Sequence, residues 1–168
     1  MPITLCALAE QHIPQILEAC QDWEELAQYG PPYWRPRSSA ELRRKIADTA
    51  GPQPATAYTS VLVDDSHLVG EVSIHAIDWR NRVAQVGVCI WRPDDRGQGY
   101  GRAGTEAAIA WALDELGLLR LEAWILASNG ASQTLFASLG FMHEGTLAGR
   151  YRYGGAQQDV AVYGLVRR

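Results

Sequence analysis

The sequence lacks the features that mark several large classes of protein. It has no run of about 18 or more apolar residues, so no segment is long enough to span a membrane as a helix. Its formal net charge is −4, whereas a nucleic-acid-binding domain is expected to carry a basic patch and a high isoelectric point. Its first residues lack the charged-then-apolar order of a signal peptide. We therefore expect neither a membrane nor a nucleic acid as a partner.

Cysteine is also scarce. Cys6, Cys20 and Cys89 lie far apart and are odd in number, and no CxxC pair or Cys/His cluster accompanies them. This pattern predicts reduced thiols in a cytoplasmic protein, and it predicts no bound metal. A catalytic role for Cys89 would need a basic partner that holds its thiolate.

The length and composition are those of one globular domain. The chain has 168 residues, and domains commonly contain about 100–200. Its apolar fraction of 47% and charged fraction of 20% are ordinary for a soluble globular protein. No repeat, low-complexity tract or long linker divides the chain. We expect residues 1–168 to form a single domain.

The N-terminal third is predicted to contain one strand and two helical stretches. Gly30-Pro31-Pro32 ends the first helical stretch, because proline lacks a backbone donor and fixes φ. Ser38 and Glu41 have the spacing of a capping box at the start of the second stretch, which Gly51-Pro52 ends. The expected elements are a strand at 3–8 and helices at about 13–29 and 38–51.

From residue 55 onward, strands dominate. Three segments rich in β-branched and aromatic residues are separated by the turn residues 64–66 and 78–81, which predicts an antiparallel meander. A long alanine-rich helix and a shorter helix then alternate with the remaining strands. The order of elements is typical of an α+β fold with a mixed sheet, and not of a doubly wound fold. The expected strands are 56–63, 68–77, 82–91, 119–126, 141–147 and 158–166, and the helices are 102–116 and 131–139.

A glycine-rich loop precedes the long helix. It reads Arg96-Gly97-Gln98-Gly99-Tyr100-Gly101. Alternating glycines let the backbone approach a ligand and turn its N–H groups toward it. The start of the helix adds free N–H groups and a partial positive charge. The segment therefore predicts a seat for a phosphate or a diphosphate.

The glycine-rich segment matches other kinds of loop less well. A P-loop requires a Gly-Lys-Ser/Thr sequence, and this loop has no lysine. A dinucleotide-binding loop belongs in the first turn of a parallel βαβ unit, whereas the strand before this loop closes an antiparallel meander. A strand-to-helix turn with no ligand would need only one glycine, and three glycines cost conformational entropy.

The loop resembles the pyrophosphate-binding loop of the GNAT superfamily of acyl-CoA N-acyltransferases, and further motifs follow in the order of that family. The chain looks most like the branch that contains the ribosomal-protein N-terminal acetyltransferases and their small-amine relatives. The resemblance covers about residues 68–167. It implies a mostly antiparallel sheet with helices on both faces and one splayed pair of parallel strands. The segments that carry it are Arg96-x-x-Gly99-x-Gly101, Glu115-Leu116-Gly117-Leu118, Ala127-Ser128-Asn129-Gly130-Ala131-Ser132, Leu139-Gly140-Phe141-x-x-Glu144-Gly145, Tyr153-Gly154-Gly155 and the strand 159–165.

The resemblance implies that acetyl-CoA is the co-substrate. The donor would lie between the strands 86–91 and 119–126, with backbone groups near Val88 pairing with the pantetheine arm. The loop N–H groups would hold the diphosphate, and Asn129 would reach the pantetheine arm or cap its helix. The residues assigned to the donor in this way are Val88, Cys89, Ile90, Arg96, Gly97, Gln98, Gly99, Tyr100, Gly101, Arg102, Asn129, Ser132 and Phe136.

The catalytic positions depart from the family pattern. Many members have a glutamate where this chain has Gln85, and a tyrosine acid where it has Phe136. The resemblance suggests that Ser132 contacts the leaving thiolate. A glutamate that some members use as a base aligns with Tyr151. The sequence therefore leaves the general base open.

Two more candidates for the base lie on the strand 68–77. Glu71, Ser73 and His75 point to one face of it, because side chains alternate along a strand. A hairpin folded about 78–81 would place His75 opposite Gln85 and Glu71 opposite Cys89. A slip of one residue in the register would reverse this arrangement. The candidate catalytic residues are Ser132, Glu71, His75 and Tyr151.

The resemblance also places the acceptor amine. Its walls would be the segments 29–37 and 150–153, both rich in aromatic residues and arginine, and the expected pocket residues are Tyr33, Trp34, Gln85 and Tyr151. A protein N-terminus, an amino sugar, an aminoglycoside, a polyamine and an amino acid all remain open as the acceptor. Dimers are common in the family. The alternatives are an acyl-CoA-binding protein without activity, which the missing glutamate and tyrosine motivate, and a nucleotide-binding regulatory domain.

Overall fold

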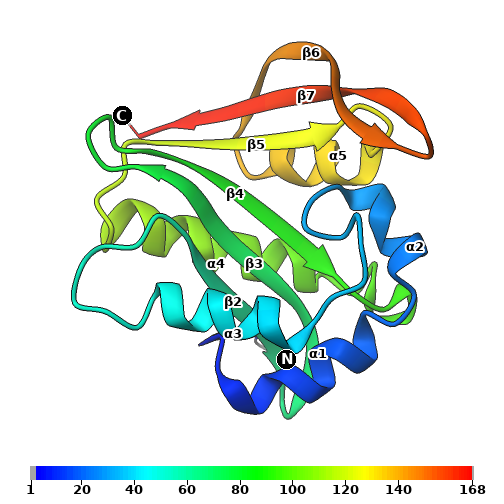
Figure 1. Ribbon diagram of the computed structural model, residues 1–168. Coiled ribbons are helices and arrows are strands. Elements are labelled where there is room, and N and C mark those ends of the chain that lie inside the picture. The colour runs from blue at the N-terminus through cyan, green and yellow to red at the C-terminus, as the bar shows by residue number, and fades with distance from the viewer. Residues whose placement is uncertain (1–2, 168) are drawn as a thin grey trace.

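The computed structural model describes residues 3–167, which form a seven-stranded sheet flanked by helices (Figure 1). The strands lie in the order β1-β2-β3-β4-β5-β7-β6, and all neighbours are antiparallel except β4 and β5, which run parallel. This confirms the predicted α+β fold with a mixed, mostly antiparallel sheet. The strands are β1 (Thr4–Ala7), β2 (Tyr58–Asp64), β3 (His67–Asp78), β4 (Val83–Ile90), β5 (Arg120–Leu126), β6 (Met142–Tyr153) and β7 (Ala156–Val166).

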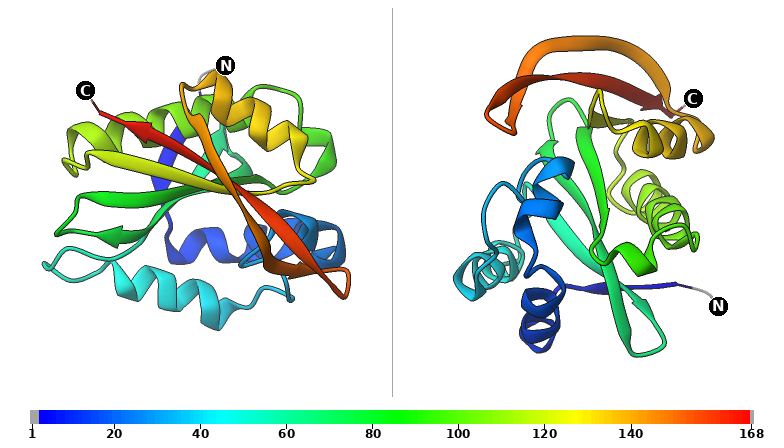
Figure 2. Two further views of the ribbon diagram at one scale, coloured as in Figure 1. Left: turned by 90° about the horizontal axis from the view of Figure 1, so that it is seen from above. Right: turned by 90° about the vertical axis from the view of Figure 1, so that its right-hand side faces the viewer.

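The helices form two layers. Those from the first third of the chain cover one face of the sheet, and α4 and α5 cover the other (Figure 2). None of the helices within residues 3–167 is long and apolar enough to cross a membrane. The helical elements are η1 (Glu10–His12), α1 (Ile13–Ala19), α2 (Trp23–Leu26), η2 (Ala27–Tyr29), α3 (Ser39–Asp48), η3 (Pro93–Asp95), α4 (Tyr100–Asp114) and α5 (Gly130–Ser138).

Each layer of helices packs on its own hydrophobic core. The core beneath α4 and α5 joins alanines of α4 to aliphatic side chains of the central strands and to Phe136 and Phe141. The second core joins α1, α2 and α3 to the opposite face of the sheet through residues such as Ile16, Leu26 and Leu42. Because both faces of the sheet are covered, its central strands are held firmly. An opening between two of these strands therefore reflects the point at which their backbone hydrogen bonding stops.

Two predicted elements differ from the structure in ways that the local sequence explains. The helical stretch expected at 13–29 breaks at residues 20–22, where the Asp22 carboxylate caps α2 by accepting the N–H of Glu25 at 3.1 Å. Strand β6 continues beyond the expected end at residue 147 through a register shift between Leu147 and Tyr151. The α3 boundary is confirmed at its start, where the Ser38 hydroxyl accepts the N–H of Glu41.

Candidate active site

The parallel strands β4 and β5 separate part-way along their length. Their pairing ends at Gln85 and Glu122, although β4 continues to residue 90 and β5 to residue 126 (Figure 1). Beyond that point β4 pairs only with β3, and β5 only with β7. The backbone edges of 86–90 and 123–126 therefore face each other without a strand between them. A cavity of ≈ 470 Å³ occupies this opening, and residues of both strands line it.

The glycine loop lies at one end of this cavity, and its backbone N–H groups from Gly97 onward have no acceptor in the described part of the chain. Within residues 3–167, no backbone N–H from Gly97 to Arg102 donates to a protein acceptor; the first α4 amide that does so is that of Ala103, to the Gly99 carbonyl. Gly97 and Gly99 have φ of +74° and +87°, a region that favours glycine, and a Cβ at either would meet nothing within 4 Å. The loop is therefore an open concave array of donors at the positive end of a helix.

Arg96 supports this loop from behind. Its guanidinium donates to both carboxylate oxygens of Glu25, at 2.6 and 2.9 Å, and to the carbonyls of Ile90 and Trp91. It also lies over the Tyr29 ring, 4.9 Å from the ring centroid. The hydrogen bond to Glu25 raises the pKa of this guanidinium. The side chain thus ties the end of β4 to α2 and orients the loop that follows.

Arg96 itself lines the cavity, but two residues that were assigned to the donor from the sequence, Gln98 and Tyr100, do not line it. The Gln98 side chain is exposed. The Tyr100 hydroxyl donates to Asp64 of β2 at 2.7 Å. Only the backbone amides of these two residues belong to the donor array.

The start of α5 forms the opposite wall of the cavity. The Asn129 side chain caps this helix by accepting the N–H of Ser132 at 3.1 Å. Its amide nitrogen has no acceptor in the described part of the chain, so it is available to a ligand. Ser132 and Phe136 line the cavity as well, and Phe136 packs edge-on against Phe141 with ring centroids 5.1 Å apart.

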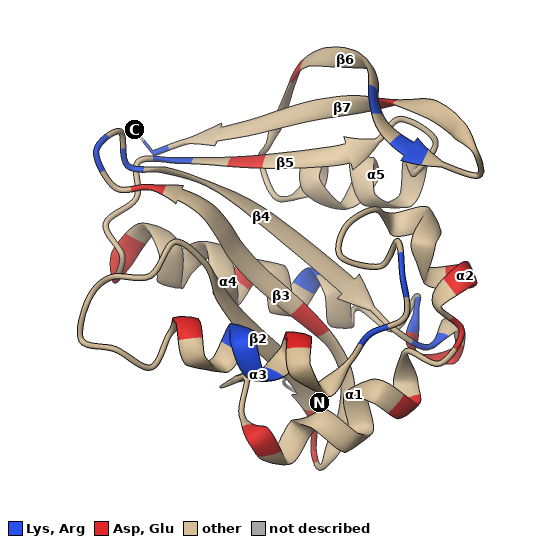
Figure 3. Ribbon diagram, in the orientation of Figure 1, with Lys and Arg blue, Asp and Glu red and all other residues tan. Residues whose placement is uncertain are grey.

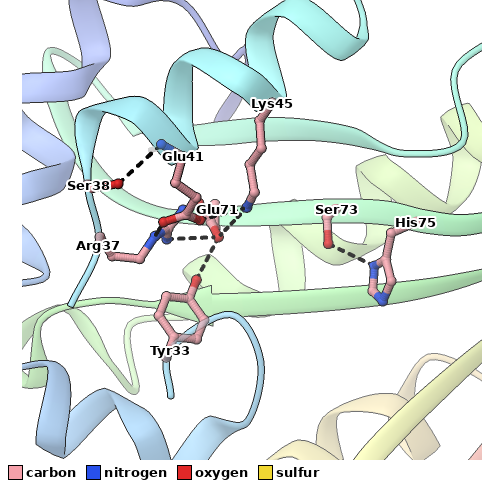
Figure 4. A network of polar contacts seen from close by, with 8 residues as sticks. All are labelled: Tyr33, Arg37, Ser38, Glu41, Lys45, Glu71, Ser73 and His75. Carbon is pink, nitrogen blue, oxygen red and sulfur yellow. Dashed lines mark hydrogen bonds and ion pairs between the residues drawn. The ribbon is translucent and has the colours of Figure 1, made fainter. Parts of the chain in front are cut away.

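His75, Ser73 and Gln85 form a polar group on the cavity wall. The register predicted for the hairpin is confirmed, because His75 pairs with Gln85 and Glu71 with Cys89. His75 Nδ1 lies 3.0 Å from the Ser73 hydroxyl (Figure 4). Burial lowers the pKa of the imidazole below its ordinary 6.5, and the neighbouring Gln85 side chain, whose carbonyl oxygen can accept from the protonated ring, only partly offsets this. The ring is therefore neutral at neutral pH.

Gly87 leaves the space that this histidine needs. A Cβ at this position would lie 3.4 Å from His75 Cε1 and 3.6 Å from the Ser73 hydroxyl oxygen. Real Cβ atoms seldom approach other atoms as closely as the first of these distances. The absence of a side chain at Gly87 thus leaves room for the imidazole next to β4 in the cavity lining.

Glu71 lines the same cavity, and one oxygen of its carboxylate, Oε1, is engaged, whereas the buried Oε2 has no hydrogen-bond partner within residues 3–167. Oε1 accepts the Tyr33 hydroxyl at 2.7 Å and Arg37 Nη1 at 3.3 Å, and Lys45 Nζ lies 3.9 Å away (Figure 4). Glu41 holds the other side of Arg37 at 3.0 Å. Burial alone would raise the pKa of Glu71, but the charges of Lys45 and Arg37 and the Tyr33 hydrogen bond outweigh it and lower the pKa.

Comparison with known proteins identifies the family to which this chain belongs. A profile described as "Acetyltransferase (GNAT) domain" matches residues 3–142, which is most of the chain. The chain belongs to the GNAT acetyltransferases. The family predicted from the glycine loop is thus confirmed, and the opening between β4 and β5 is the splayed parallel pair that the resemblance implied.

Several relatives are similar over most of this chain. A putative ribosomal N-acetyltransferase, YdaF of Bacillus subtilis, is 29% identical over 76% of the chain and 66% of its own length. RimL, a ribosomal L7/L12 α-N-protein acetyltransferase solved with coenzyme A, is 20% identical with a TM-score of 0.89, covering 99% of this chain and 94% of its own. A spermidine N-acetyltransferase from Vibrio cholerae, solved with CoA and spermine, is 22% identical with a TM-score of 0.81, covering 98% and 95%. The two structures establish the fold.

The two expected walls of the acceptor pocket meet at the cavity between β4 and β5. Tyr33 and Tyr151 both line it, and a Cβ at Gly30 would lie 3.8 Å from the Tyr151 ring. Trp34 was expected in the same pocket, but its side chain is 60% exposed and lines a separate, shallower hollow with Trp23. The cause is the close packing of Tyr33, which turns its neighbour in the chain outward.

Sequence reasoning missed Trp124 at this site, whereas Arg150 belongs to the segment 150–153 that was expected to wall the acceptor pocket. Trp124 of β5 lines the cavity, and Arg150 of β6 lies over its ring. Alternation along β5 would have placed Trp124 on the same face as Glu122, since the two differ by two positions. Nothing in the sequence indicates the register shift that brings Arg150 to it.

Proposed function

We propose that this protein transfers an acetyl group from acetyl-CoA to a primary amine by direct attack within a ternary complex. The observation that carries the proposal is the cavity between β4 and β5, which opens beside the unpaired amides of 97–102. A diphosphate suits such a donor array at a helix start, and an extended amide-containing arm suits an unpaired strand edge. Coenzyme A has both features. The membership in the GNAT family supports the same reading.

The proposed placement of the donor follows the shape of the cavity. The diphosphate would be held by the amides of Gly97 to Arg102, and the pantetheine arm by the edge of β4 around Val88, Cys89 and Ile90. Asn129 would donate to the arm through its free amide nitrogen. Because these elements extend from residue 86 to residue 132, and the acceptor walls reach from residue 29 to residue 151, we propose that residues 1–168 act as one domain. The three free thiols favour a cytoplasmic location.

Among the four candidate catalytic residues, His75 suits the role of general base. The attacking amine must lose a proton, and a neutral imidazole whose Nδ1–H donates to the Ser73 hydroxyl would accept it at Nε2. Glu71 is held as a carboxylate by two cations, which makes it a weak base. Burial raises the pKa of Tyr151, so its hydroxyl stays protonated and cannot act as the base. Ser132, which lines the cavity, would donate a hydrogen bond to the departing thiolate.

An assay of thiol release from acetyl-CoA with a panel of amines tests the function. The wild-type protein is expected to turn over at least one of them. Relative to it, His75→Gln should lose about 10²–10⁴-fold in kcat/KM. Its pH profile should also lose an acid limb that lies below 6.5, the ordinary pKa of histidine. Gln85→Ala is the matched control on the same wall, since glutamine cannot accept the proton, and it should retain much more activity.

A second candidate function is acyl-CoA binding without catalysis. It is favoured by Gln85 and Phe136, which occupy positions where many family members have a glutamate and a tyrosine. Calorimetric binding of CoA with no thiol release from any amine would support it. Turnover of any amine, with the loss expected for His75→Gln, would exclude it.

A further inference from the structure

Arg150 is an exposed residue that lies against two aromatic side chains beside the cavity. Its guanidinium carbon lies 5.3 Å from the Trp124 ring centroid and 5.5 Å from that of Tyr151, and both rings line the cavity. The position is fixed by the backbone, because the β6 register shift lies just before Tyr151, and Gly149, with φ of +58°, donates its N–H to Asp159 Oδ1 at 2.8 Å. The position of the guanidinium thus depends on its contacts with the two rings and on the register shift in β6, which the hydrogen bond from Gly149 to Asp159 stabilises.

The charge of Arg150 is not neutralised by the described part of the protein. No carboxylate within residues 3–167 lies within ion-pair distance of it, although Trp124 is itself hydrogen-bonded to a carboxylate, that of Glu122. That carboxylate directs one oxygen to Arg120 and the other to the indole N–H. The N–H groups of Arg150 therefore have no carboxylate partner within residues 3–167, on the side from which the acceptor would enter.

The acceptor side of the cavity also lacks a free negative charge. Among the described residues, its lining contains one carboxylate, that of Glu71, which Arg37 and Lys45 compensate. A polycationic acceptor would find no net negative charge there, because Arg37 and Lys45 balance Glu71 and Glu41. Basic positions lie instead at the end of β6 and in the loop that leads to α3 (Figure 3).

We propose that Arg150, clamped between Trp124 and Tyr151, is an anion-binding subsite, and that the acceptor is an amine that also carries a carboxylate. This inference rests on the proposed function, because it describes the second substrate of the same site. A guanidinium fork matches a carboxylate in geometry, and the two rings hold the fork beside the cavity. The subsite selects acidic acceptors and disfavours polyamines.

Two peptides that differ in one charge test the subsite. Ser-Asp-amide and Ser-Asn-amide have the same length and the same α-amine, and spermidine serves as the cationic acceptor. In thiol-release assays at low salt, the wild-type protein should prefer the aspartyl peptide by about tenfold or more in kcat/KM. Arg150→Ala should lose that factor for the aspartyl peptide alone, and Arg150→Lys should retain part of it. Arg44→Ala, at an exposed arginine of α3, should change neither.

A binding measurement separates failure of the subsite from failure of the proposed function. The N-acetylated forms of both peptides are titrated into the CoA-saturated protein, which requires no turnover. Absence of turnover with every amine would contradict the proposed function, while a preference for the acetylated aspartyl peptide that Arg150→Ala abolishes would still support the subsite. Equal binding of the two peptides to wild type, preference for spermidine, or equal losses for both peptides in Arg150→Ala would overturn the inference.

Discussion

Replacing Glu71 with glutamine removes the negative charge from a buried group of ionised side chains. The side chain is only 8% exposed, and its oxygen contacts Arg37 at 3.3 Å and Lys45 at 3.9 Å. Arg37 is 1% exposed, so its charge stays buried when Glu71 is neutralised. Breaking a buried ion pair by removing one partner costs about 3–5 kcal/mol. Because Glu41 still pairs with Arg37, we expect the lower end, about 3 kcal/mol.

Urea unfolding of the wild type and two variants measures this cost. Glu10→Gln is the matched control, since it breaks a closer ion pair, with Arg43 at 2.7 Å, whose side chains are 64% and 59% exposed. Exposed pairs contribute about 0–1 kcal/mol, so this control should change the free energy of unfolding little. The comparison therefore separates burial from distance as the source of the effect.

The pH dependence supplies an independent check. The folded-state pKa of Glu71 is lowered from 4.5, so its contribution to stability is full above that value and is lost as the pH falls through the folded-state pKa. The difference between the wild type and Glu71→Gln should accordingly shrink below pH 4.5. A Glu71→Gln protein that is as stable as the wild type but has no activity would refute this reasoning, because it would make Glu71 a catalytic base.

Three further predictions concern packing, thiols and the cap of α5. Gly70→Ala should lose about 1–3 kcal/mol of stability in thermal unfolding, because the added Cβ would overlap the Cys89 carbonyl oxygen; an unchanged midpoint would contradict this. With a disulfide reagent at mildly alkaline pH, only Cys6 should react fast, since burial raises the pKa of Cys20 to about 12 and raises that of Cys89 as well; rapid loss of all three thiols would count against it. Asn129→Ala should cost about 1 kcal/mol and weaken CoA binding, and equal CoA affinity in calorimetry would argue for a cap alone.

The fold was predictable from the sequence where local patterns determine it. The turn residues 78–81 set the register that brings His75 opposite Gln85, and the alternation along β3 then places Glu71 on the same face. The glycine loop was predictable because positive φ at Gly97 and Gly99 is a local requirement. The break of the first helical stretch was missed, although Asp22 is a cap residue in the right place.

The electrostatics of the site depended on contacts between distant segments. The negative charge of Glu71 is balanced by Arg37 and Lys45, which are about 30 positions away in the chain. Only the packing of α3 on β3 brings these side chains together. Arg96 fits the family motif, but its contact with Glu25 spans 71 positions. Arg150 depends on an irregularity in β6. In each case the sequence contained the residue, and the pairing arose from tertiary structure.

Calorimetric titration of CoA into three proteins tests the central claim most directly. Gly99→Glu places a negative charge among the amides of 97–102, where a Cβ meets nothing within 4 Å. Gly154→Glu is its control, because it also has positive φ and open space but lies at the tip of the β6–β7 hairpin. The wild type and Gly154→Glu should bind CoA equally, and Gly99→Glu should bind it about 10–100-fold more weakly. No binding by the wild type, or equal affinity in Gly99→Glu, would contradict the account.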